Sequence, residues 1–244
     1  GPLSMDTPWN KDLRDQIIGL GERSVHKSYY TQMRRRMAEL EDLLEGAIAA
    51  LSTISEIRDP YTGGHQQRVA ELAEGLARTM GLDGPTCRLL HVAGMLHDIG
   101  KISVPFEILN KPRSLTEAEF SLVRTHSESG YEILRPLRFE GPVAEIVREH
   151  HERLDGSGYP QGLRGDGLRL ESRILAVADV VEAMSFHRPY RPALGISAAL
   201  EEILAGRGIR FDPRVCDACS ALLGEGRPPF TFSRDGLGSL GPCG

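Results

Sequence analysis

The sequence predicts an all-α fold, and three observations support that prediction. Apolar residues recur at steps of three and four over most of the chain, a pattern typical of helices that bury one face. Alternation with a period of two, which marks half-buried strands, is nearly absent. The 244 residues have an ordinary apolar content of 40%, enough for a sizeable core. We therefore expect a bundle of helices.

Residues 5–55 form a charged, helical N-terminal region. They follow Gly-Pro-Leu-Ser at positions 1–4, which is typical of an expression scar. Seven apolar residues recur in this region at alternating steps of four and three: Met33, Met37, Leu40, Leu44, Ala47, Leu51 and Ile54. This heptad seam predicts a coiled-coil homodimer through residues 10–55. One amphipathic helix packed on its own domain would give the same pattern.

Residues 56–224 predict a series of amphipathic helices with short breaks. We expect these helices over residues 62–80, 85–97, from 116 onward, 142–151, 171–184, 196–205 and after 213. The clearest helix start is at Thr116, because Thr116 and Glu119 have the spacing of a capping box. Residues 225–244 are rich in Gly, Pro and Ser, which predicts a flexible tail.

Composition and charge argue against some classes of function and leave others open. A net charge of -5 argues against binding a nucleic-acid polymer, which needs a basic face, although a small anionic substrate stays open. Four cysteines form no dense disulfide framework, so we expect a cytoplasmic protein. Cys216 and Cys219 are expected to be structural, since no second metal-binding pair lies near them. No apolar stretch approaches the length of a membrane span.

Five histidines and two aspartates fall largely on apolar helix faces or at predicted helix ends. They are His65, His97, Asp98, His126, His150, His151 and Asp179. A single histidine on an apolar face is more often a core residue than a ligand. A buried aspartate is different, because an isolated carboxylate is costly to bury unless a cation meets it. Asp179, in the apolar run from Ile174 to Val181, is such a residue.

These seven side chains are too many for one tetrahedral zinc ion. They suit two first-row transition ions that prefer nitrogen and oxygen ligands, such as iron or manganese. The core of a helical bundle is a known place for such sites. Because a carboxylate is the natural bridge between two ions, we expect Asp98 to bridge them.

The motifs around these residues resemble those of the HD phosphohydrolase superfamily. His97-Asp98 is followed by Gly100-Lys101, as in the core of that superfamily. The segment His150–Pro160 resembles the signature of its HD-GYP branch. Further similarities follow in chain order at Asn110-Lys111-Pro112, Asp179 with Ala183, Arg188-Pro189-Tyr190-Arg191 and Phe211-Asp212-Pro213. The resemblance covers about residues 52–224 and implies an HD-domain helical bundle with a Gly-rich turn.

The resemblance implies a phosphodiesterase that hydrolyses cyclic di-GMP to linear pGpG, with further cleavage to GMP left open. It implies that the seven residues bind two divalent metal ions, most readily iron and alternatively manganese. Two such ions would lower the pKa of a water between them, so that hydroxide attacks the phosphorus. Some members hold a third ion through a Glu, but the corresponding residue here is Tyr61, so we expect a binuclear site.

The resemblance assigns substrate contacts to Lys101, Arg188 and Arg191. Lys101 would stabilise the phosphate and protonate the leaving oxygen, and Asp98 would take part in catalysis through the ions. The arginines would clamp phosphate oxygens.

Other residues of the motif are expected to support the site. Glu152 and Asp155 are expected either to orient imidazoles or to be surface charges. Gly158, Tyr159 and Pro160 are expected to shape the pocket wall.

Three other functions remain open at this point. The first is hydrolysis of another cyclic dinucleotide, and the second is a di-iron oxygenase, which the arginine pair disfavours. The third is a low-turnover module that senses cyclic di-GMP and transmits a conformational change along residues 10–55. A sensor domain upstream is expected if the chain is a fragment.

Overall fold

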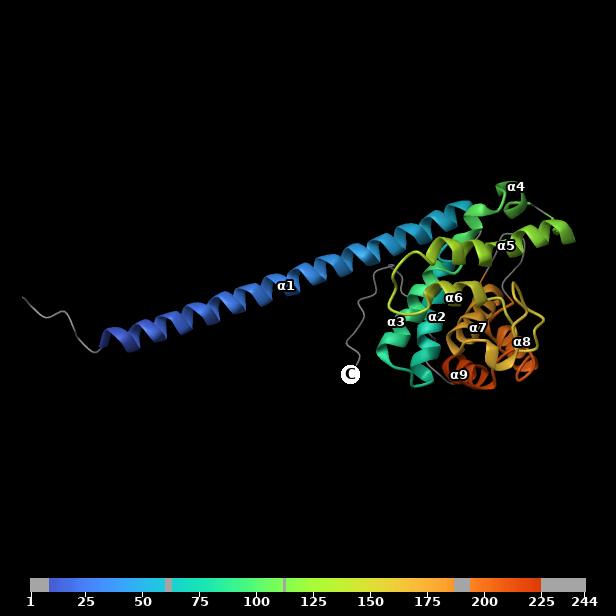
Figure 1. Ribbon diagram of the computed structural model, residues 1–244. Helices are drawn as coiled ribbons and strands as arrows, with labels where there is room; N and C mark the ends of the chain where they lie inside the picture. The colour runs from blue at the N-terminus through green and yellow to red at the C-terminus, as the bar shows by residue number, and fades with distance from the viewer. Residues whose placement is uncertain (1–8, 60–62, 112, 187–193, 225–244) are drawn as a thin grey trace, which may run out of the picture. The chain divides into compact units, whose positions relative to one another are not determined.

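The computed structural model describes residues 9–59, 63–111, 113–186 and 194–224, with side chains from residue 27 onward (Figure 1). Over these residues the fold is helical, with two isolated β-bridges in place of any strand, so the predicted all-α class is confirmed. None of the described helices is long and apolar enough to cross a membrane.

Most elements follow one another through short connections, but 15 residues separate α6 from η3. In chain order they are α1 (Trp9–Arg58), α2 (His65–Thr79), α3 (Gly84–Leu96), the 3₁₀ turn η2 (Ile99–Ser103), α4 (Phe106–Leu109), α5 (Glu117–Leu134), α6 (Val143–Glu149), the 3₁₀ turn η3 (Gly165–Gly167), α7 (Leu170–Ser185), α8 (Ile196–Ala205) and α9 (Pro213–Leu223).

The chain divides into two compact units, residues 1–47 and 48–244. In the first unit α1 exposes large apolar side chains, among them Met37 and Leu40. In the second unit the last turns of α1 pack on the bundle through Ile48, Ser52 and Ser55, which are 1–9% exposed. The predicted boundary after residue 55 stays a prediction.

The core of the second unit lies between α2, α3, α6 and α7, which Figure 1 shows gathered together. Leu72, Leu90, Ile146 and Ile174 are among its fully buried side chains. The close approach of α2 and α3 depends on Gly94, because a Cβ there would lie 2.5 Å from the Cα of Ala70. An alanine at this position would force the two helices apart.

Local sequence signals placed most helices correctly. Thr116 caps α5 through the predicted capping box, in which its side chain and that of Glu119 each bind the other residue's backbone N–H. The predicted helices did not include the 3₁₀ turn η2. Gly100 in this turn packs directly on α5, because a Cβ there would lie 1.9 Å from the carbonyl oxygen of His126.

The carboxylate of Asp212 stabilises the N-terminus of α9. Its carboxylate accepts the backbone N–H of Arg214 at 2.8 Å, and it pairs with Arg173 Nη1 at 2.9 Å. Burial alone would raise the pKa of Asp212, but its hydrogen bonds to Arg214 and Arg173 outweigh burial and lower this pKa to about 2. The carboxylate therefore stabilises the folded state when it is ionised.

Replacing Asp212 with Asn is expected to lower the free energy of unfolding at pH 7 by about 2–4 kcal/mol, because the ion pair with Arg173 is lost while asparagine still caps the helix. In the wild type this stabilisation is present above about pH 4 and is lost as the pH falls towards 2. Urea unfolding at pH 7 and pH 3 measures both effects. An equal difference between wild type and variant at the two pH values would contradict the assignment.

Candidate metal centre

The seven predicted ligands meet inside the second unit, although they are distant along the chain. They come from the start of α2 (His65), the end of α3 (His97), the turn into η2 (Asp98), the middle of α5 (His126), the end of α6 (His150 and His151) and the middle of α7 (Asp179). Four of the five histidines are 0–2% exposed. The bundle therefore converges on a polar centre within an apolar core.

Four of the imidazole rings are anchored through Nδ1. In three of them Nδ1 donates to the carbonyl oxygen three residues earlier on the same helix: His97 to Gly94 (2.7 Å), His126 to Val123 (2.7 Å) and His150 to Val147 (2.5 Å). In the fourth, Nδ1 of His65 contacts the carboxylate of Glu182. Since every partner is an acceptor, each Nδ1 carries the proton and each Nε2 has a free lone pair.

The donor atoms separate into two groups, within each of which all the donor atoms lie within 4.8 Å of one another. One group comprises His65, His97 and Asp98, and the other comprises His126, His150 and His151. Lone pairs of neutral imidazoles and a carboxylate, converging at this spacing, fit two divalent ions. The residues present are thus suited to the binuclear centre that the sequence predicts.

Each aspartate faces both groups. Asp98 directs Oδ2 towards Nε2 of His97 at 3.4 Å and Oδ1 towards Nε2 of His126 at 3.6 Å. Asp179 directs Oδ1 towards Nε2 of His65 at 3.5 Å and Oδ2 towards Nδ1 of His151 at 4.0 Å. The sequence analysis singled out Asp98 for a bridging role, and the structure gives Asp179 the same two-sided arrangement.

The electrostatics of the centre favour cation binding. Burial lowers the pKa of His150 to about 3, and it also lowers the pKa of His126 and of His151. Burial would raise the pKa of Asp98, but Lys101 and the surrounding imidazoles hold it well below its ordinary value. Neutral imidazoles and ionised carboxylates are the protonation states in which these groups bind metal ions.

Lys101 lies at the edge of this centre. Its Nζ is 2.7 Å from Oδ2 of Asp98 and 3.0 Å from Oδ2 of Asp59. Burial would lower the pKa of Lys101, but the two aspartates raise it above its ordinary value. The ammonium group is therefore a fixed positive charge beside the metal ligands.

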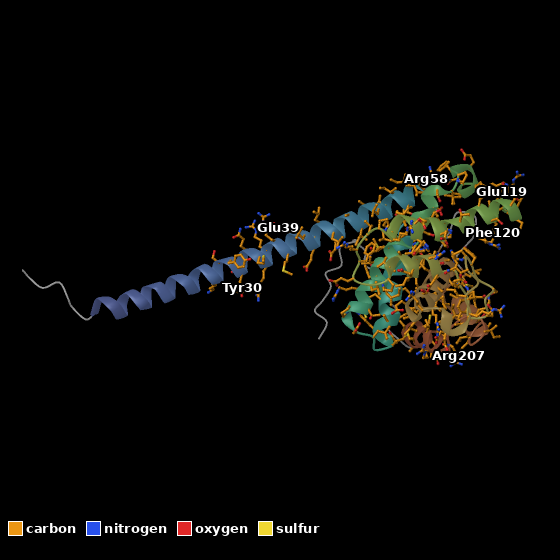
Figure 2. The ribbon with its side chains drawn as sticks, viewed as in Figure 1. Tyr30, Glu39, Arg58, Glu119, Phe120 and Arg207 are labelled. Atoms are coloured by element: carbon orange, nitrogen blue, oxygen red, sulfur yellow. The ribbon has the colours of Figure 1, made fainter. Side chains whose placement is uncertain are left out.

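The end of α1 holds the turn that carries Asp98. Ser55 donates its buried hydroxyl to the carbonyl oxygen of Asp98 at 2.9 Å. Arg58, which Figure 2 shows at the C-terminal end of α1, donates to the carbonyl oxygen of Val104 at 2.9 Å. The backbone between Asp98 and Val104 is thus tied to α1 at both ends.

Glu182 and Arg68 are two supporting residues that the sequence analysis missed. Glu182 is 2% exposed and accepts from Nε of Arg68 at 2.7 Å while it contacts His65. A carboxylate behind a ligating histidine fixes the ring and raises its basicity. The available signal was the spacing, because Glu182 follows Asp179 by three residues and so shares its helix face.

Glu152 and Asp155 have different roles from those expected. Glu152 is fully buried and accepts three backbone N–H groups, from Gln161 (2.6 Å), Gly162 (3.1 Å) and Leu163 (3.0 Å). Asp155 accepts the backbone N–H of Ser157 at 3.0 Å. Both carboxylates therefore stabilise the Gly-rich turn, and the expectation that they orient imidazoles is corrected.

The Gly158-Tyr159-Pro160 segment lies against the ligand histidines. The ring of Tyr159 is centred 4.7 Å from that of His151 at an interplanar angle of 34°. Gly158 permits this contact, since a Cβ there would lie 2.4 Å from the carbonyl oxygen of His151. Pro160 follows at the exposed side of the turn. The roles predicted for Arg188 and Arg191, and the position of Tyr61, lie outside the described residues.

A helical bundle that buries two groups of His and Asp ligands is an architecture in which metal-dependent enzymes assemble their sites. The sequence profile of the HD domain family matches residues 49–215, and the chain belongs to that family. The predicted resemblance to the HD-GYP phosphodiesterases is therefore confirmed.

Two relatives illustrate the similarity. The cyclic di-GMP phosphodiesterase response regulator RpfG of Xanthomonas campestris is 39% identical over 208 residues, which are 84% of this chain and 54% of that protein. The 3′3′-cGAMP-specific phosphodiesterase 1 of Vibrio cholerae is 38% identical over 219 residues, which are 88% of this chain and 49% of that protein. The chain thus spans about half the length of these relatives.

A solved structure supports the fold. The crystal structure of the V. cholerae cyclic GMP-AMP phosphodiesterase V-cGAP3 superposes with a TM-score of 0.58 at 21% identity, covering 75% of this chain and 49% of that one.

Replacing Glu182 with Gln is expected to weaken metal affinity roughly 10- to 100-fold, because the His65 ring loses its ionised partner. Equilibrium dialysis followed by elemental analysis measures this affinity. Glu74→Gln is the matched control, because Glu74 is also a buried carboxylate of this unit and pairs with Arg78 and His91. Equal metal affinities in the two variants would refute the supporting role of Glu182.

Proposed function

We propose that this chain is a metal-dependent phosphodiesterase that hydrolyses cyclic di-GMP to linear pGpG. The observation that carries the proposal is the complete ligand set, in which Asp98 and Asp179 each face both groups of imidazoles. Relatives named as cyclic di-GMP phosphodiesterases support the substrate class. Cytoplasmic location is part of the proposal and has its support in the low cysteine content.

When bound, two divalent ions, iron or manganese, would supply Lewis-acid activation of water and of the phosphate. The residues of the chain orient the ligand atoms for this chemistry. Asp98 and Asp179 each face both donor groups, and the Nδ1 hydrogen bonds of His97 and His126 orient the Nε2 atoms of these two rings. Lys101 is proposed to contribute a positive charge that stabilises the phosphoryl oxygens; the aspartates that raise its pKa favour this role over donation of a proton to the leaving oxygen. Arg188 and Arg191 are proposed to hold the phosphates.

The second candidate substrate is 3′3′-cGAMP. Three V. cholerae relatives, 36–41% identical to this chain, are named as specific for that dinucleotide. The two substrates differ in one base and share the phosphodiester linkages, so the metal centre alone does not discriminate between them. A low-turnover sensor of cyclic di-GMP would use the same residues with slow release of product.

The test is hydrolysis of cyclic di-GMP, 3′3′-cGAMP and cyclic di-AMP by protein loaded with iron or manganese in the absence of air. We expect cyclic di-GMP to have the highest kcat/KM, and Asp98→Ala to lose both metal and activity because its carboxylate faces both donor groups. Metal-loaded wild type that hydrolyses none of the three dinucleotides would overturn the proposal. Full metal content in Asp98→Ala would contradict the bridging role.

We also propose that α1 forms a parallel homodimer through the heptad seam of residues 10–55. The seam residues Met33, Met37, Leu40 and Leu44 are 46–64% exposed. Below them, α1 packs on its own domain with Ile48, Ser52 and Ser55, which are not seam positions. In a parallel pair Arg36 of one helix faces Glu41 of the other, which favours that direction. Such a helix would connect the domain to a sensor domain upstream, if one is present.

Ala47→Asp places a charge in the seam and is expected to convert the dimer to a monomer, because a buried carboxylate faces its own copy. Ala38→Asp makes the same change outside the seam and is expected to leave the dimer intact. Sedimentation equilibrium of both variants measures the association. A monomeric wild type, or equal effects of the two substitutions, would contradict the seam.

A further inference from the structure

Arg124 lies on α5 two residues before the ligand His126, and the metal centre makes no use of it. Its side chain is 41% exposed and pairs through Nη1 with Glu117, a 79% exposed carboxylate, at 3.4 Å. Its buried Nε has no hydrogen-bond partner among the residues that the structure describes. Because a buried guanidinium N–H is costly to leave unsatisfied, this donor indicates a partner that the described residues do not supply.

Arg124 is part of a row of planar side chains, formed with Tyr159 and Phe120, that extends away from the metal centre. Its guanidinium carbon lies 5.6 Å from the centre of the Tyr159 ring and 4.5 Å from that of Phe120. Tyr159 in turn packs on His151. Figure 2 shows Phe120 near the N-terminal end of α5, where it is 38% exposed. The row thus connects a metal ligand with the surface.

The chemistry of this row fits a nucleobase rather than a phosphate. Bases that are not paired stack on aromatic rings and on arginine planes, whereas a phosphate gains nothing from Phe120 or Tyr159. The donors of an arginine match the O6 and N7 acceptors of guanine, while adenine presents a donor in place of O6. The row also begins at the centre where the phosphodiester is to be cleaved.

We propose that Arg124, with Phe120 and Tyr159, forms a nucleobase subsite that prefers guanine. This inference rests on the proposed function, since it assigns the base of the same dinucleotide whose phosphate binds at the metal centre. Arg124 is then a specificity-determining residue that contacts the substrate outside the reacting atoms.

The test compares Arg124→Ala and Arg124→Lys with the metal-loaded wild type. We expect KM for cyclic di-GMP, and Kd for its hydrolysis-resistant phosphorothioate analogue, to rise roughly 10- to 100-fold in both variants. Lysine keeps the charge but lacks the planar fork, so it should not rescue the preference for guanine over adenine. The rate with bis(p-nitrophenyl) phosphate, a phosphodiester without a base, and the metal content should stay unchanged.

Arg148→Ala is the matched control, because Arg148 also stacks on a tyrosine, with its guanidinium carbon 4.7 Å from the Tyr131 ring, and is paired with Glu128. It should leave every one of these measurements unchanged. Wild-type Kd for the analogue in Arg124→Ala would overturn the subsite, even while the wild type still hydrolyses cyclic di-GMP. A parallel loss of the bis(p-nitrophenyl) phosphate rate would also overturn it, since the role would then be structural. Failure of the proposed function would show instead in the wild type, as absence of turnover.

Discussion

The architecture of the second unit depends on two carboxylates that each face two groups of imidazoles: Asp98, which is buried, and Asp179, whose side chain is 13% exposed. An ionised carboxylate in an apolar core is strongly destabilising unless positive charge compensates it. Lys101 supplies part of this charge to Asp98, and the donor geometry fits two cations. Three of the imidazoles, those of His97, His126 and His150, are anchored by carbonyl groups of their own helices. The orientation of these rings is therefore set by the fold.

Close backbone packing makes this arrangement possible. Gly94 brings α2 and α3 together, Gly100 brings η2 onto α5, and Gly158 brings the Gly-rich turn onto the residues after α6. At each position a Cβ would lie within 2.5 Å of a backbone atom of the neighbouring segment. Gly100 of the HD motif is thus required for a steric reason, because the segments that hold Asp98 and His126 touch at this position.

Much of the fold and the ligand set could be predicted, because both depend on short-range patterns. The capping box at Thr116 and the apolar periodicity of α7 are local, and the ligand residues are distinctive in type and motif. The roles of Glu152 and Glu182 were not predictable in this way. Glu152 serves backbone groups nine to eleven residues away, and Glu182 supports a histidine on another helix. Such roles depend on which helix faces meet, and only tertiary packing decides that.

The last turns of α1 have one face packed on the bundle and another face that is exposed. Ile48, Ser52 and Ser55 face the bundle, and the hydroxyl of Ser55 holds the carbonyl group of Asp98. Ile54 and Ile57 on the same turns remain exposed. Asp59, which follows the last turn of α1, also pairs with Lys101, and Lys101 pairs with Asp98. The end of α1 therefore contacts both the backbone of Asp98 and the charged groups that surround its carboxylate.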